Sequence, residues 1–150
     1  MAKPIYVLNG PNLNLLGTRE PEVYGKETLD DLRQRCERKA KSLGLAVDFR
    51  QSNLEGELVT WIQEARTEAS GVIVNAGAFT HTSIAMLDAL LACPVPSIEV
   101  HLTNIFTREP FRHRSYISKA AKGVICGFGG LGYEFAIEAL AATISPGQAG

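Results

Sequence analysis

The feature that most constrains the fold is a regular alternation between short apolar runs and longer segments in which apolar residues recur at helical spacing. The strand-like segments occupy residues 5–8, 45–49, 72–74, 95–100 and 123–126. The helix-like segments occupy residues 29–43, 54–65, 84–91 and 134–143. Strands that alternate with helices in this way predict a parallel sheet with helices on both faces.

The number of strand-like segments favours a flavodoxin-like α/β fold, a three-layer α/β/α arrangement around a five-stranded parallel sheet. With 150 residues, 45% of them hydrophobic, the chain has the size and composition of one globular domain, and we expect residues 1–150 to form a single domain. Thr28 and Asp31 have the spacing of a capping box for the first helix, and Gly44 is placed to end it. The small polar tail Ser145–Gly150 is expected to fray.

Charge and cysteine content indicate a cytoplasmic protein that binds a small molecule. Fifteen Lys and Arg residues balance 16 Asp and Glu residues, so the net charge of −1 provides no broad basic surface for nucleic acid or membrane. The first apolar run is too short for a secretory signal, and no apolar stretch approaches the roughly 20 residues of a membrane span. Cys36, Cys93 and Cys126 are odd in number and form no C-x-x-C pair, which disfavours disulfides.

Polar clusters follow three of the predicted strands at the point where each strand ends. They are Asn9–Asn12 after the first strand, Asn75–Gly77 after the third, and Glu99–His101 at the end of the fourth. In an open parallel sheet, ligands bind outside the carboxyl ends of the strands. We therefore expect these three clusters to meet in one crevice.

Several other chemistries are disfavoured. Gly127–Gly132 fits G-x-G-x-x-G, but residues 133–150 are too few for the rest of a dinucleotide-binding unit, so a tight turn and close helix–strand packing explain the glycines better. Neither H-E-x-x-H nor C-x-x-C occurs to mark a metal site. The side chains that could in principle converge on a metal are His81, His101, His113, Asp88 and Glu99. No lysine lies within an apolar run, which disfavours Schiff-base chemistry.

Two pairs of side chains have spacings that suit acid–base chemistry. Glu99 and His101 are two residues apart on a predicted strand, so they share a face, and a carboxylate can orient an imidazole and stabilise its protonated form. A surface charge pair on an edge strand is the alternative explanation. Arg19 and Tyr24 lie in a polar segment, 17–25, with glycine at each end, a composition that suits a mobile lid. A nearby guanidinium would favour the Tyr24 phenolate and make it a base.

Two further segments are typical of anion binding. Thr80–Ser83 opens a predicted helix, where backbone amides and the helix dipole favour an anion. Interleaving of basic residues with Pro110, Phe111 and Tyr116 favours a structured anion-binding loop over a solvated one. The basic residues of this loop are Arg108, Arg112, His113, Arg114, Lys119 and Lys122.

Five blocks of the sequence, in register, resemble those of the type II 3-dehydroquinate dehydratases. The first block reads Asn-Gly-Pro-Asn-Leu-Asn-Leu-Leu-Gly-Thr-Arg-Glu-Pro-Glu-Val-Tyr-Gly. The blocks span residues 9–25, 51–57, 75–83, 98–104 and 108–112. The similarity extends from Ile5 to Thr143, so it covers nearly the whole chain.

This resemblance implies a set of catalytic roles. Tyr24 would remove a C2 proton from 3-dehydroquinate, and Arg19 would hold its phenolate. Asn12 would steady the enolate through a bound water. His101 would protonate the departing C1 hydroxyl, and Glu99 would orient His101. The products would be 3-dehydroshikimate and water, with no cofactor and no metal, in the shikimate pathway to aromatic amino acids or in quinate catabolism.

The resemblance also implies how substrate is held. Asn75 and the backbone amides of Leu102 and Thr103 would bind the substrate carboxylate. The remaining substrate-binding residues, which contact the ring hydroxyls or support the lid, would be His81, Asp88, Arg108 and Arg112. Family members are typically dodecamers built as four trimers, in which Asp88 would reach a neighbouring subunit's site. The alternative function is a non-enzymatic flavodoxin-like binding module, which would not need Arg19, Tyr24 and His101 together.

Overall fold

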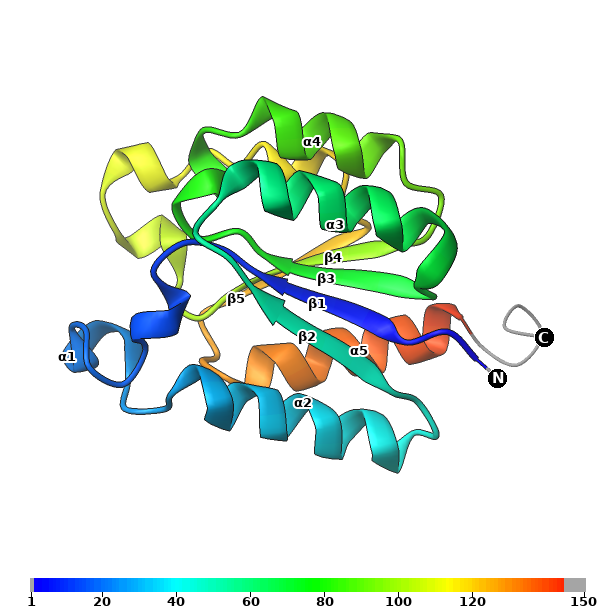
Figure 1. The fold of residues 1–150 in the computed structure, drawn as a ribbon. Helices are drawn as coiled ribbons and strands as arrows, with labels where there is room; N and C mark the ends of the chain where they lie inside the picture. The colour runs from blue at the N-terminus through cyan, green and yellow to red at the C-terminus, as the bar shows by residue number, and fades with distance from the viewer. Residues whose placement is uncertain (1, 145–150) are drawn as a thin grey trace.

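The structure is a computed structural model that describes residues 2–144, and it contains a five-stranded parallel sheet (Figure 1). The strands are β1 (Ile5–Asn9), β2 (Val47–Gln51), β3 (Gly71–Asn75), β4 (Ser97–His101) and β5 (Gly123–Cys126). Their spatial order is β2-β1-β3-β4-β5, and all neighbours are parallel. This is the flavodoxin-like winding that the sequence predicts, so the predicted fold class is confirmed.

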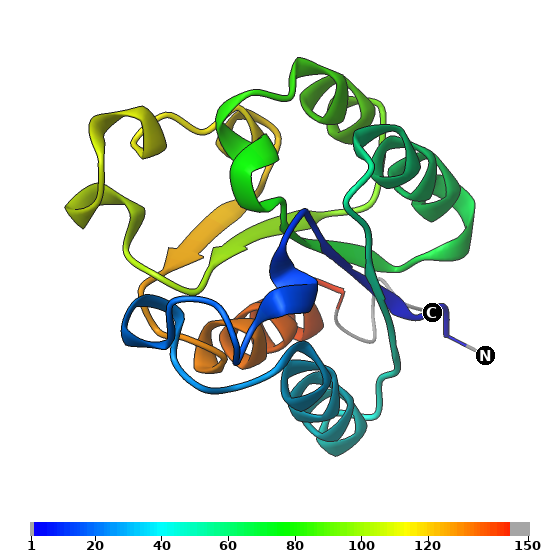
Figure 2. The same ribbon diagram turned by 60° about the vertical axis from the view of Figure 1, so that its left-hand side comes forward.

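Helices cover both faces of the sheet, because alternate residues of each strand build a separate apolar core on each side. The helices are α1 (Pro21–Tyr24), α2 (Leu29–Ser42), α3 (Glu55–Glu68), α4 (Ile84–Leu91) and α5 (Leu131–Thr143). Val7, Ile73 and Val100 belong to the core under α2 and α5, whereas Leu8 and Val74 belong to the core under α3 and α4 (Figures 1 and 2). Within residues 2–144, no helix combines the length and apolar character needed to cross a membrane.

The ends of the elements largely follow the local sequence signals. Thr28 and Asp31 form the predicted capping box, and Gly44, at φ +73°, follows the end of α2. Helix α5 begins three residues before the predicted start at 134, because the glycine turn at Gly129 leads directly into it. Strand β4 begins at Ser97 instead of residue 95, since Pro96 has no N–H to donate to the ladder. The predicted frayed tail lies outside the described residues.

Gly10 allows a close approach between the loops that follow β1 and β3. A Cβ atom on Gly10 would lie 2.2 Å from the carbonyl oxygen of Ala76, so only glycine lets the loops after β1 and β3 cross at this distance. The Gly10 N–H donates to the Asn75 carbonyl across the same gap (2.8 Å). At Gly132, between α5 and β5, an added Cβ would lie 3.4 Å from the Ile125 side chain, an ordinary van der Waals distance, so the close packing predicted for this glycine motif does not require glycine here.

Candidate active site

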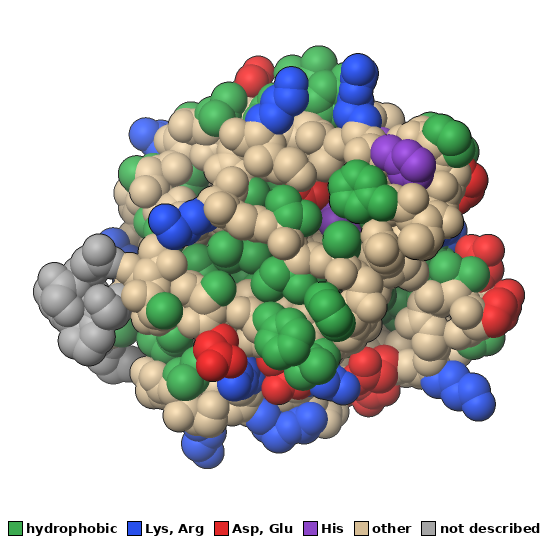
Figure 3. Space-filling model, turned by 180° about the vertical axis from the view of Figure 1, so that it is seen from behind, with side chains coloured by type: hydrophobic (Ala, Val, Ile, Leu, Met, Phe, Trp, Pro, Cys, Tyr) green, Lys and Arg blue, Asp and Glu red, His purple; other side chains and the backbone are tan. Residues whose placement is uncertain are grey.

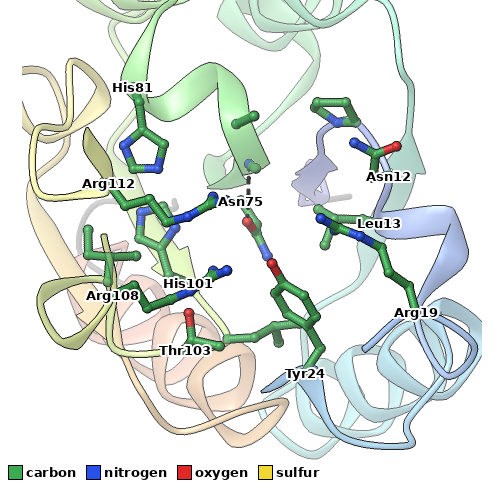
Figure 4. Close-up of a pocket in the computed structure, with 15 residues that line it drawn as sticks. Asn12, Leu13, Arg19, Tyr24, Asn75, His81, His101, Thr103, Arg108 and Arg112 are labelled. Atoms are coloured by element: carbon green, nitrogen blue, oxygen red, sulfur yellow. Dashed lines mark hydrogen bonds between the residues drawn. The ribbon is translucent and has the colours of Figure 1, made fainter. Parts of the chain in front are cut away.

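A cavity of about 110 Å³ lies at the carboxyl ends of β1, β3 and β4, where the three polar clusters meet as predicted (Figure 4). All predicted site residues except Glu99 and Asp88 line it. The lining residues are Pro11, Asn12, Leu13, Arg19, Tyr24, Asn75, Gly77, Ala78, His81, His101, Leu102, Thr103, Ile105, Arg108 and Arg112. None of these described residues is acidic, so the cavity suits an anionic ligand.

Tyr24 lies at the end of the short helix α1, within the segment 17–25. Two guanidinium groups flank its ring, with the Cζ atoms of Arg19 and Arg108 5.1 and 5.2 Å from the ring centre. In Figure 4 the Tyr24 side chain extends from the lower rim toward the centre of the cavity. The Tyr24 ring therefore lies close to two positively charged groups. The Arg19 contact follows the sequence expectation, whereas the Arg108 contact does not come from any spacing in the sequence.

His101 and Glu99 are both buried at the end of β4 and hydrogen-bonded to each other through His101 Nε2. Strand β4 lies between β3 and β5, so the alternative explanation of a surface pair on an edge strand is wrong. Ser115 Oγ also donates to the Glu99 carboxylate (2.7 Å), and so does Ser118 Oγ. Burial opposes ionisation of Glu99, but the bonds from His101, Ser118 and Ser115 outweigh it and lower the pKa of this carboxyl. Among residues 2–144, Nε2 is the ring nitrogen of His101 that has a hydrogen-bond partner, which leaves Nδ1 for a ligand.

The two asparagines of the cavity are held in different ways. Asn12 has a left-handed backbone (φ +68°), a conformation that asparagine tolerates better than most residues, and its N–H donates to Asn53 Oδ1 (3.0 Å). Asn75 is almost completely buried at the end of β3. Its Nδ2 donates to the hydroxyl of Tyr133 (2.8 Å), a residue of α5 that sequence reasoning did not identify.

Positively charged and imidazole groups gather on one side of the cavity in Figure 4, namely His81, His101, Arg108 and Arg112. His81 comes from the turn before α4 and its Nδ1 contacts the Arg114 carbonyl (2.7 Å). Burial lowers the pKa of His81 more than this contact raises it, which favours the neutral ring. Of the predicted anion-binding loop, Arg108 and Arg112 line the cavity, whereas its other basic residues lie outside the lining.

Two predicted residues are placed outside the cavity wall. Glu99 is not part of the lining but is hydrogen-bonded to His101, which is. Asp88 is exposed on α4 and is not part of the lining formed by its own chain.

The predicted anion-binding segment before α4 ends in Ser83, whose side chain caps the helix by accepting from the Met86 N–H (2.9 Å). Within residues 2–144, no three His, Cys, Asp or Glu side chains converge as metal ligands would.

Fold and site together define a flavodoxin-like α/β protein with a cationic cavity that contains a tyrosine, a histidine–carboxylate pair and two asparagines. The family model described as dehydroquinase class II matches residues 3–141, and the chain belongs to this family.

Relatives and solved structures agree with this assignment. The 3-dehydroquinate dehydratase of Phenylobacterium zucineum is 60% identical over 141 residues, which cover 94% of this chain and 97% of that protein. The 3-dehydroquinate dehydratase 2 of Pseudomonas aeruginosa is 55% identical over 138 residues, covering 92% and 93%. The crystal structure of type II dehydroquinase from Propionibacterium acnes has a TM-score of 0.91 at 46% identity, covering 95% of this chain and 98% of that one.

Proposed function

We propose that this chain is a 3-dehydroquinate dehydratase, a hydro-lyase that removes water reversibly from 3-dehydroquinate to give 3-dehydroshikimate. Family membership and the activity named for its relatives support this function over a non-enzymatic binding module. The reaction is an anti elimination through an enolate, and it serves either the shikimate pathway to aromatic amino acids or quinate catabolism. The cavity's excess of positive charge suits both the substrate carboxylate and the enolate.

Tyr24 is the base in this proposal. Its phenolate removes the C2 proton, which is acidified by the neighbouring C3 ketone, and the electrons move onto the ketone oxygen as an enolate. The guanidinium groups of Arg19 and Arg108 beside the ring support the charge that Tyr24 needs before the step. Arg108 also links the anion-binding loop to the segment that carries Tyr24, in keeping with a role in supporting the lid. Asn12 steadies the enolate oxygen through a water molecule.

His101 is the acid that completes the elimination. When the enolate collapses, the C1–O bond breaks and the leaving hydroxyl takes a proton from His101, so that water departs. Glu99 fixes the ring through Nε2 and stabilises the protonated imidazole before it gives up the proton. Ser115 and Ser118 hold the carboxylate in place. The reaction therefore uses two side chains on opposite faces of the substrate ring, as anti elimination requires.

The remaining groups hold the substrate. Asn75 and the backbone amides of Leu102 and Thr103 bind the carboxylate, and all three residues line the cavity. The neutral imidazole of His81 and the guanidinium of Arg112 bind the ring hydroxyls of the substrate. These contacts need no cofactor and no metal.

We also propose that the chain works as a cytoplasmic homododecamer, a tetramer of trimers, in which Asp88 reaches a neighbouring subunit's site. Asp88 is exposed on α4 beside apolar side chains that are more than half exposed, Ile84 and Leu91. A second apolar surface, visible in Figure 3, covers β5 and α5. Its exposed residues are Val124, Phe128, Leu131 and Phe135. Exposed apolar groups of this kind are typical of protein interfaces, and the unpaired cysteines suit a reducing compartment.

The observation that carries the proposed function is the position of Tyr24 and His101 in one cationic cavity. The test adds 3-dehydroquinate to the purified protein and follows the near-ultraviolet absorbance of the conjugated enone. We expect turnover by the unaltered chain and by Tyr6→Phe, whose hydroxyl contacts Glu64 outside the cavity. Tyr24→Phe should lose turnover by orders of magnitude. Binding of substrate without enone formation by the unaltered chain would instead support the binding module.

A further inference from the structure

We infer that Tyr133, together with Asn9, is a positioning residue that fixes which end of the Asn75 carboxamide faces the substrate. Asn9 and Asn75 are register partners on β1 and β3 and lie on the same face of the sheet. Tyr133 comes from α5, is completely buried, and places its hydroxyl between the two amides. The inference rests on the proposed function, in which Asn75 binds the substrate carboxylate.

The hydrogen bonds of this group run in one direction only. Asn9 Nδ2 donates to the carbonyl of Arg50 on β2 (2.9 Å), so Asn9 Oδ1 must accept. The Tyr133 hydroxyl donates its single proton to that Oδ1 (2.6 Å). Its oxygen can then only accept from Asn75, and the Nδ2 group of Asn75 donates to it (2.8 Å). The backbone of β2 thereby sets the orientation of an amide on β3.

A second contact favours the same orientation of Asn75. The Gly77 N–H donates to Asn75 Oδ1 (3.3 Å). A flipped amide would therefore place its NH₂ group against the Gly77 N–H, donor against donor, and its oxygen against the Tyr133 oxygen, whose proton is already donated to Asn9. Burial raises the pKa of Tyr133 far above the neutral range, so the hydroxyl keeps its proton. One hydrogen of Asn75 Nδ2 is used by Tyr133, and the other remains for a carboxylate in the cavity that Asn75 lines.

Without Tyr133 the amide loses the shorter of the two contacts that distinguish its ends, and the 3.3 Å contact from the Gly77 N–H is left. The amide oxygen could then face the cavity, where it would repel a carboxylate that the nitrogen attracts. The effect should fall on binding, because the Tyr133 hydroxyl is hydrogen-bonded to Asn9 and Asn75, and Asn75 is the residue that holds the substrate carboxylate in the proposed function. A change in KM with little change in kcat would distinguish this positioning role from a role in proton transfer.

The experiment compares Tyr133→Phe and Asn9→Ala with Tyr6→Phe as the matched control. Tyr6 is also buried in the sheet, but its hydroxyl donates to Glu64 away from the cavity. For Tyr133→Phe we expect KM, and the inhibition constant of the product 3-dehydroshikimate, to rise about tenfold, the size of one hydrogen bond to a charged group. kcat should change less than about threefold, at every pH from about 6 to 9, since Tyr133 does not titrate there.

Asn9→Ala tests the chain of hydrogen bonds from Asn9 through Tyr133 to Asn75, because Asn9 is not part of the cavity lining. It should raise KM as Tyr133→Phe does, and the double variant should be no worse than the poorer single variant, since both act through one amide. Unchanged KM in Tyr133→Phe, a loss of kcat in place of a rise in KM, or additive effects in the double variant would each overturn the inference. An inactive unaltered chain would instead refute the proposed function.

A measurement that needs no turnover tests the role of Tyr133 separately from the proposed function. In the unliganded protein, the side-chain amide protons of Asn75 should exchange with solvent at least about tenfold faster in Tyr133→Phe than in Tyr6→Phe, because a buried hydrogen bond has been removed. Equal exchange in the two variants would show that Tyr133 does not hold the amide. Thermal melting of all variants verifies that they are folded.

Discussion

Replacing Glu99 by Gln removes one charge and changes almost no volume, so it isolates the electrostatic support of His101. The Glu99 carboxylate is completely buried and accepts from three donors: His101 Nε2, Ser115 Oγ and Ser118 Oγ. A glutamine side chain offers one acceptor oxygen and an NH₂ group that must face at least one of those donors. The bond to the protonated imidazole therefore weakens or is lost.

The size of the effect follows from that bond. A hydrogen bond to a charged group contributes about 1.5–3 kcal/mol, which corresponds to a rate factor of about 10–150. We expect Glu99→Gln to lower kcat by about that factor and to change KM little, since Glu99 is not part of the cavity lining. Initial rates of enone formation measure both constants. Glu64→Gln is the matched control, because Glu64 binds Tyr6 and Arg50 away from the cavity.

The same variant has a defined effect on stability. The folded-state pKa of Glu99 is below its ordinary value of 4.5, so the unfolded chain binds the proton more readily than the native state. The carboxylate therefore stabilises the fold above pH about 4.5, and this contribution is lost as the pH falls through the lower, folded-state pKa. The Tm difference between the unaltered chain and Glu99→Gln should shrink on acidification.

For the kinetic prediction, a kcat of Glu99→Gln within about twofold of the unaltered value would refute the proposal that Glu99 supports His101.

Three other predictions follow from the structure. Gly10→Ala should destabilise the fold by about 3 kcal/mol or more in urea unfolding, because its Cβ would meet the Ala76 carbonyl at 2.2 Å, whereas Gly56→Ala, with open space around it, should not. If Asp88 completes a neighbour's site, unfolding, mixing and refolding equal amounts of Asp88→Ala and Tyr24→Phe should restore about a quarter of the sites, those that take Tyr24 from one variant and Asp88 from the other. Mixed oligomers that show no activity above that of the two parents would contradict this. Dialysis against a strong chelator should leave activity intact, and a loss reversed by added metal would be evidence against metal-free chemistry.

The sequence was sufficient for the fold because its elements are marked by local signals. The apolar runs place β5 at the predicted residues 123–126, and the Thr28–Asp31 pair begins α2 as expected. The boundaries that differ depend on backbone details, such as the turn before Leu131 and the missing N–H of Pro96. The spacing of apolar residues in helices and strands does not predict where such a turn or a missing N–H ends an element.

The cavity was predictable where its residues follow strands. Asn12, Asn75 and His101 lie near one another because parallel strands end at the same edge of a sheet. Partners brought in by tertiary packing were not predictable, since no spacing connects Tyr133 with Asn75 or Ser118 with Glu99. The family resemblance names the cavity residues, but the contacts that hold them in place come from the structure.

Hydrogen exchange at C2 of the substrate tests the division of labour between the base and the acid most directly. In D₂O, enolate formation by Tyr24 should replace the C2 hydrogen that it removes with deuterium. NMR detects this exchange in the substrate even when no dehydration follows. His101→Ala should keep this exchange while losing dehydration, because the base and its guanidinium neighbours are intact.

Tyr24→Phe should lose both exchange and dehydration, and Tyr6→Phe should keep both. C2 exchange in Tyr24→Phe at the rate of the unaltered chain would contradict the central claim that Tyr24 is the base.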